Sequence, residues 1–102
     1  MNAVLDREIA KWNLAVNLWE RMSLAGRGYQ WLADRLTERS GEIVYHSRIQ
    51  KLLEQTSSPD WSFVLNISEV FDCTVEDLAK KPTKTAEKAY RERFPRFSEK
   101  VA

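Results

Sequence analysis

The sequence contains few of the residues on which cross-linked or metal-bound small proteins depend. Among its 102 residues there is one cysteine, Cys73, and one histidine, His46. A single cysteine excludes a disulfide within the chain and any metal site built from several cysteines. One histidine with no second histidine or cysteine nearby argues against a metal centre. We therefore expect no metal and no cofactor, and a fold stabilised by its hydrophobic core.

Long apolar runs and catalytic motifs are missing as well. No stretch approaches the roughly 20 consecutive apolar residues of a membrane span, and the N-terminal region lacks the basic-then-apolar pattern of a secretory signal. There is no glycine-rich phosphate loop and no Ser or Cys with a plausible base close by in the sequence. These absences predict a cytoplasmic protein that has no catalytic residues, no membrane contact and no small-molecule substrate.

Charge is distributed unevenly, although the formal net charge is only +1. Residues 1–78 contain eight Lys/Arg and twelve Asp/Glu, whereas residues 79–102 contain eight basic and three acidic residues. Residues 59–78 contain five acidic residues and no basic one. Such asymmetry indicates charged partners. The basic tail could follow the phosphates of a duplex, or it could settle against the acidic 59–78 segment of a neighbouring subunit.

The spacing of the apolar residues predicts an all-α fold of five helices in a domain of residues 1–81. The first helix covers about residues 3–24 and ends at Gly26 and Gly28. The others cover about 29–39, 44–54, 60–71 and 74–80, with Ser58 or Asp60 as the cap of the fourth and Thr74 as the cap of the fifth. The residues expected to face inward on the fourth helix are Trp61, Val64, Leu65, Ile67 and Phe71.

Residues 82–102 form a basic tail. The stretch TKTAEKAYRERF, ahead of Pro95, could form a further amphipathic helix. The tail contains Tyr90, Phe94 and Phe97, and the long first helix has more apolar surface than one bundle needs. We expect these two regions to supply the contacts of a homodimer.

The third predicted helix has an unusual polar face. Its apolar residues are Val44, Ile49, Leu52 and Leu53, and the remaining positions contain side chains that form hydrogen bonds in fixed geometry. Arginine can form two hydrogen bonds with guanine and glutamine two with adenine, while serine and histidine are versatile partners. The face is chemically compatible with the edges of DNA bases, and it consists of His46, Ser47, Arg48, Gln50 and Lys51.

Two stretches resemble the Cro/C1-type (XRE-like) helix-turn-helix family of bacterial and phage repressors. VYHSRIQKLLEQ is similar to the recognition helix of the phage Cro repressors, and the stretch after Pro59, WSFVLNISEVFDCTVEDL, has apolar residues where the family places them. The resemblance covers about residues 20–79. Two features depart from the family: TERSGEI makes the connection before the third helix about six residues longer than usual, and Leu53 and Gln55 replace the usual Glu and Gly.

The resemblance implies a five-helix bundle whose third helix lies in the major groove of double-stranded DNA. The base-reading residues would then be His46, Ser47, Arg48 and Gln50, while Lys51 could reach a base or a phosphate. Phosphate contacts are expected at the start of the second helix, where free amide groups favour an anion, and just after the third helix. The phosphate-contacting candidates are Tyr29, Gln30, Thr56, Ser57 and Ser58.

Two functions are compatible with this pattern. The first is a sequence-specific transcriptional repressor of a phage or bacterium, which binds a two-fold operator as a homodimer and blocks RNA polymerase. The second is a protein-interaction module of the antirepressor or antitoxin type, which has the helix-turn-helix fold and little affinity for DNA. The near-neutral charge favours the second function, as do the acidic residues Asp34, Glu38 and Glu42 near the long connection.

Overall fold

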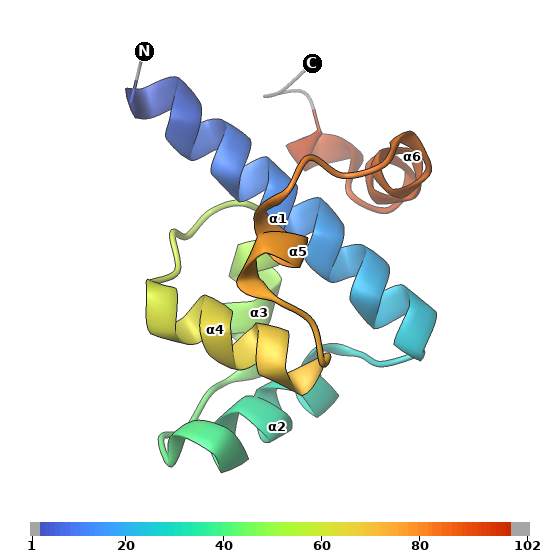
Figure 1. Cartoon of the computed structure of the whole chain (residues 1–102). Coiled ribbons are helices and arrows are strands. Elements are labelled where there is room, and N and C mark those ends of the chain that lie inside the picture. Colours follow the sequence, from blue (N-terminus) through green and yellow to red (C-terminus); the bar gives the residue numbers. More distant parts are fainter. Residues whose placement is uncertain (1–2, 99–102) are drawn as a thin grey trace.

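The computed structural model describes residues 3–98, with side chains from residue 8 onward. Every regular element in this range is helical, which confirms the prediction of an all-α fold (Figure 1). The range contains six α-helices and one short 3-10 helix. They are α1 (Ala3–Ala25), α2 (Tyr29–Ser40), α3 (His46–Leu53), α4 (Trp61–Val70), α5 (Val75–Ala79), α6 (Lys84–Arg93) and η1 (Pro95–Phe97).

The long helix α1 is the centre of the fold, because α3, α5 and α6 all pack against it. Its buried apolar side chains are Trp12, Leu14, Ala15, Val16, Leu18 and Met22, which extend around more than one side of the helix. One buried polar side chain is also part of this contact. The side-chain amide of Asn17 donates hydrogen bonds to the carbonyl of Leu78 at 2.9 Å and to that of Lys80 at 2.8 Å. Asn17 therefore satisfies carbonyl groups at the end of α5 that the helix itself leaves open.

Helix α4 faces the core with a side that differs in part from the one predicted: Ile67 is buried as expected, and Val64 and Phe71 pack against the core. Phe63, Ile67 and Ser68 are buried, whereas Trp61 is 67% exposed and Leu65 is 40% exposed. The prediction that Trp61 and Leu65 point inward is wrong. The helix has apolar residues on nearly all sides, so its own pattern does not select a face, and its packing against α2 and α5 makes the selection.

Helix α5 is short and has a strong cap. Thr74 and Asp77 form a capping box, in which the backbone N–H of Asp77 donates to the Thr74 hydroxyl and the backbone N–H of Thr74 donates to the Asp77 carboxylate, both at 3.0 Å. The hydrogen bond from the Thr74 backbone lowers the pKa of Asp77.

The neighbouring thiol of Cys73 is half-buried, and burial raises its pKa, so it remains protonated at neutral pH.

Helix α6 packs onto α1, so part of the predicted tail belongs to the core. Tyr90 is fully buried and Phe94 is 5% exposed. Their rings meet those of Trp12 and Trp19 edge-on, with centroids 5.2 Å apart in both pairs. The Trp12 indole N–H also donates to the Glu87 carboxylate at 3.0 Å. Tyr90 and Phe94 therefore have almost no exposed surface to offer to a second copy, contrary to the prediction that they form dimer contacts.

Candidate nucleic-acid interface

Helix α3 has a buried side and an exposed side. Ile49, Leu52 and Leu53 face the core, and Val44 is buried just ahead of the helix. At 3.6 residues per turn, Ser47 and Lys51 fall on the opposite side and Gln50 lies next to them, whereas His46 is in line with Leu53 two turns later. All four polar residues are exposed, and so is Arg48. The structure thus leaves the five predicted base-reading side chains accessible on one short helix, which begins at His46 instead of residue 44.

The connection between α2 and α3 is anchored in spite of its length. The backbone N–H of Val44 donates to the Thr37 hydroxyl at 2.8 Å, and this hydroxyl donates to the carbonyl of Ala33 at 2.9 Å. Gly41 ends α2 in the left-handed conformation, with φ 76°, and its N–H reaches the Thr37 carbonyl at 3.0 Å. These bonds fix the position from which α3 starts.

Two exposed residues of this connection were not among the predicted site residues. Ile43 is 71% exposed and Tyr45 is 66% exposed, and Tyr45 occupies the N-cap position of α3 without a side-chain capping bond. The sequence places Tyr45 inside the third helix, because the stretch from Val44 onward looks like a continuous helix entrance. Large apolar side chains beside a helix start are suited to contact apolar groups of a ligand, such as the methyl group of thymine.

Arg48 differs from the other four polar residues of α3. Its guanidinium lies over the ring of Phe63 on α4, 3.8 Å from the ring centroid. The side chain therefore leans toward α4, and with Ser62, Phe63 and Asn66 it lines a hollow of about 310 Å³. Stacking occupies the face of the guanidinium plane and leaves the N–H donors at its edge available. The sequence gives no sign of this contact, because Phe63 is 15 positions away.

Two predicted contact residues are engaged with acidic neighbours on their own helices. The side-chain amide of Gln50 donates to the Glu54 carboxylate at 3.0 Å, and that of Gln30 donates to Asp34 at 2.8 Å. Each pair joins exposed side chains four residues apart, and such a pair stabilises its helix by only about 0.2–0.5 kcal/mol. A ligand can therefore replace either carboxylate at small cost.

The predicted phosphate-contacting residues lie at two helix ends. Tyr29 is half-buried and Gln30 is exposed at the start of α2, where Gly28 is the N-cap and supplies no side-chain bond. After α3, Thr56 and Ser58 are exposed and Ser57 is half-buried. The Thr56 hydroxyl donates to the Lys51 carbonyl at 3.3 Å. Helices α2 and α3 pack directly against each other.

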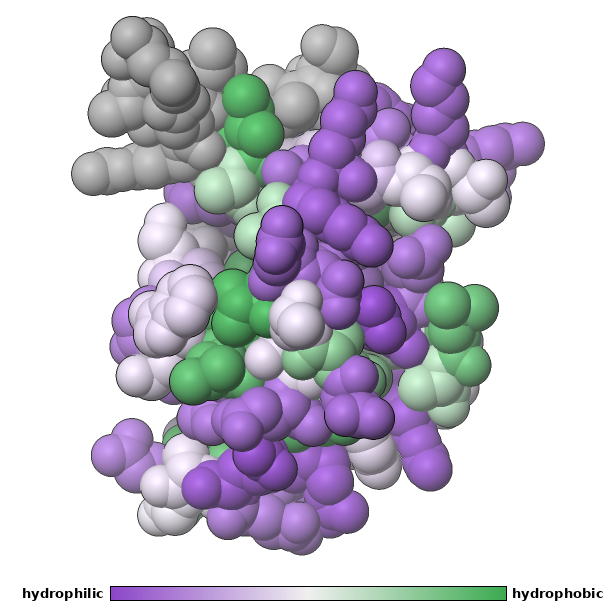
Figure 2. All heavy atoms as spheres, viewed as in Figure 1, coloured by the Kyte–Doolittle hydropathy of each residue, from purple (hydrophilic) through white to green (hydrophobic). Residues whose placement is uncertain are grey.

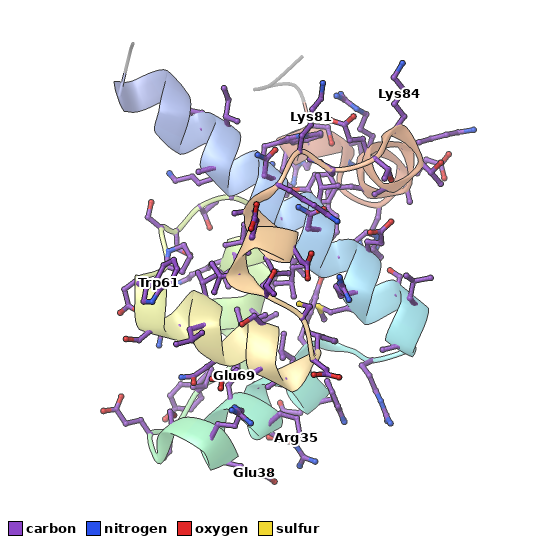
Figure 3. All side chains as sticks on the ribbon, viewed as in Figure 1. Arg35, Glu38, Trp61, Glu69, Lys81 and Lys84 are labelled. Carbon is purple, nitrogen blue, oxygen red and sulfur yellow. The ribbon has the colours of Figure 1, made fainter. Side chains whose placement is uncertain are left out.

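The charges around α2 are paired with one another. Arg35 forms an ion pair with Glu38 at 2.7 Å, and Arg39 forms one with Glu69 of α4 at 3.2 Å. Arg35, Glu38 and Glu69 lie together at the α2 end of the molecule, far from Lys81 and Lys84 in this view (Figure 3). Among the side chains that the structure describes, those of residues 8–98, no group of three His, Cys, Asp or Glu is placed to hold a metal ion.

Comparison of the chain with models of protein families, with curated proteins and with solved structures gives no match. None of the helices in the described range is long and apolar enough to cross a membrane.

Proposed function

We propose that this chain is a sequence-specific DNA-binding transcriptional regulator, in which α2 and α3 act as a helix-turn-helix of Cro/C1 type. The observation that carries the proposal is the exposed face of α3, which presents Ser47, Gln50 and Lys51, with the exposed His46 and Arg48 on either side of it. An α-helix fits the major groove, and these side-chain types match the donors and acceptors of base edges.

The stacked position of Arg48 supports this role. Phe63 holds the guanidinium at the border of the α3 face, so fewer side-chain rotamers are lost when its N–H groups meet an acceptor. The two acceptors of guanine in the major groove, N7 and O6, suit the parallel N–H groups of such a guanidinium. Arg48 is accordingly the residue that we assign to guanine recognition.

The start of α2 supplies the proposed phosphate contact. Its first amide groups have no capping side chain, since Gly28 stands at the N-cap, and the exposed Gln30 lies beside them. Such a helix start favours an anion. Thr56 and Ser58 would add neutral contacts after α3.

A helix of eight residues reads few base pairs, so we propose that the chain binds a two-fold operator as a homodimer.

The proposal is tested by selecting bound sequences from random DNA at two salt concentrations. We expect a palindromic motif, which Arg48→Ala combined with Gln50→Ala abolishes. A matched control is Lys84→Ala combined with Thr85→Ala, which removes one charge and one polar group from exposed positions of α6. The control should keep the motif, and circular dichroism should report both variants as folded.

The alternative is a protein-interaction module with little affinity for DNA. The observation that favours it is the number of carboxylates near the proposed interface, since Glu54, Asp34 and Glu38 neutralise or occupy neighbouring donors. Weak binding that disappears uniformly as salt rises, with no enriched motif, would support the alternative. Co-purification against a host lysate is then the appropriate next experiment.

A further inference from the structure

An apolar groove lies between α1, α4 and α5, and the segment Ser58–Asp60 ahead of α4 forms part of its wall. Its volume is about 350 Å³, and the side chains that line it include Ala10, Leu14, Val64, Val75 and Leu78. Figure 2 shows hydrophobic side chains gathered in the middle of this side of the molecule, with hydrophilic ones above and below.

Trp61 stands at the edge of this groove with two thirds of its surface exposed. It extends from the start of α4 and is one of the groove-lining residues (Figure 3). Leu65 follows one turn later on the same side of α4 and is 40% exposed, and Ile9 of α1 is 39% exposed. Single exposed apolar residues are common on monomers, but a large aromatic side chain next to an apolar groove is typical of a protein contact.

The charges at the groove indicate what kind of partner fits. Lys11 lines the α1 wall and Asp60 lines the opposite side, where α4 begins. Neither side chain forms an ion pair with any of the side chains described, those of residues 8–98. A partner with charge of one sign would be repelled at one of the two walls. A second copy related by a two-fold axis places Lys11 against Asp60 on both sides, because such an interface uses the same patch twice.

We propose that this groove is the contact face of a homodimer, in which Trp61 of each copy packs into the groove of the other. The buried aromatic pair would form the centre of the interface, and the two Lys11–Asp60 pairs would form its rim. The inference rests on the proposed function in one respect: the dimer is expected to hold two α3 helices on a two-fold operator. The contact itself is tested without DNA.

The first test is sedimentation equilibrium of the full chain over a range of concentrations. We expect wild type to dimerise and Trp61→Lys to raise the dissociation constant about 30-fold or more. The matched control is Leu24→Lys, which places the same charge at an 81% exposed position at the end of α1 and should leave the constant unchanged. A wild-type chain that is monomeric up to about 1 mM would overturn the inference, as would equal effects of the two lysine substitutions.

The second test addresses the two-fold pairing of charges. Lys11→Glu should weaken the dimer, and adding Asp60→Asn should restore part of the affinity, because the repulsion is removed. Asparagine is suitable because it can still cap α4, where Asp60 accepts from the backbone N–H of Phe63 at 2.9 Å. Thermal melting of each variant checks its fold. The absence of any rescue would contradict the two-fold arrangement, whereas a dimer that selects no DNA motif would count against the proposed function alone.

Discussion

Helices α3 and α4 are consecutive and similar in length, and both end in the same unusual way. Each is followed by a residue in the left-handed conformation that is not glycine: Gln55 with φ 60° after α3, and Asp72 with φ 52° after α4. Both ends form the paired hydrogen bonds of a Schellman motif, Thr56 to Lys51 and Gln55 to Leu52 in one, Cys73 to Ser68 and Asp72 to Glu69 in the other.

The two ends differ in what the left-handed side chain does. Asp72 is exposed, whereas Gln55 is 2% exposed and its amide donates to the Tyr90 hydroxyl at 3.0 Å and to the Phe97 carbonyl at 2.8 Å. The Tyr90 hydroxyl in turn donates to the carbonyl of Leu53, the last residue of α3. The end of α3 is thus bonded to α6 and η1. In α4 the left-handed residue only ends the helix. In α3 it also directs the Gln55 side chain to Tyr90 and Phe97, which are far away in the sequence.

The largest expected effect is the loss of this connection. Gln55→Ala should lower the free energy of unfolding by about 2–3 kcal/mol, because one buried and one partly buried hydrogen bond are lost and the Phe97 carbonyl is left without its donor. Gln55→Gly should cost about 1 kcal/mol less, since glycine tolerates the left-handed conformation. Urea denaturation of both variants measures this difference. A loss below about 1 kcal/mol for both would indicate that the bonds do not stabilise the fold.

An intermediate effect is expected from the ionisation of Tyr90. Burial raises the pKa of Tyr90 to about 12, above the value of about 10 for an exposed tyrosine. The folded state therefore keeps the proton while the unfolded state loses it, and this stabilisation is fully present below about pH 10 and decreases as the pH rises to about 12. We expect a loss of about 2 kcal/mol over this interval. Urea denaturation at several pH values measures it.

Tyr90→Phe is the control for this pH dependence, because it removes the phenol and keeps the ring. The free energies of unfolding of wild type and variant should converge as the pH rises, since lysines and the other tyrosines contribute equally to both. Parallel curves would contradict the raised pKa.

The smallest effect is expected at the end of α4. Asp72→Gly should raise the free energy of unfolding by about 0.5 kcal/mol, because the side chain is exposed and glycine relieves the left-handed strain. The same change to glycine is therefore stabilising at residue 72 and destabilising at residue 55. Thermal melting of the two single variants side by side tests this opposite sign, and a loss at both positions would show that Asp72 forms a contact of its own.

Much of the helical layout could be predicted from the sequence, because it depends on local signals. Gly26 ends α1, Asp60 and Thr74 cap their helices, and the apolar spacing of α1 and α3 identifies their inner faces. In α4 the same reasoning placed Ile67 correctly but Trp61 and Leu65 wrongly. Where apolar residues surround a helix, the neighbouring helices decide which side is buried.

For the candidate site, the polar face of α3 was predictable and its surroundings were not. The five base-reading candidates are exposed as expected, but the stacking of Arg48 on Phe63 joins two helices that no local pattern relates. The role of Gln55 is a second example. Glycine is the usual residue at this left-handed position after a helix, so the sequence alone gives no reason for a glutamine there. The reason is the pair of hydrogen bonds that its side chain forms with Tyr90 and Phe97.

The packing of α6 on α1 has a consequence for how the chain folds during synthesis. The hydrogen bond from Trp12 to Glu87 spans 75 positions in the sequence, and α1 emerges from the ribosome long before the helix that covers it. Until then the faces of Trp12 and Trp19 that meet α6 have no native partner, and contacts of such large sequence separation form slowly. A nascent chain of this protein would therefore expose aromatic surface that favours aggregation, and it would gain full resistance to proteases only after α6 has been made and has packed against α1.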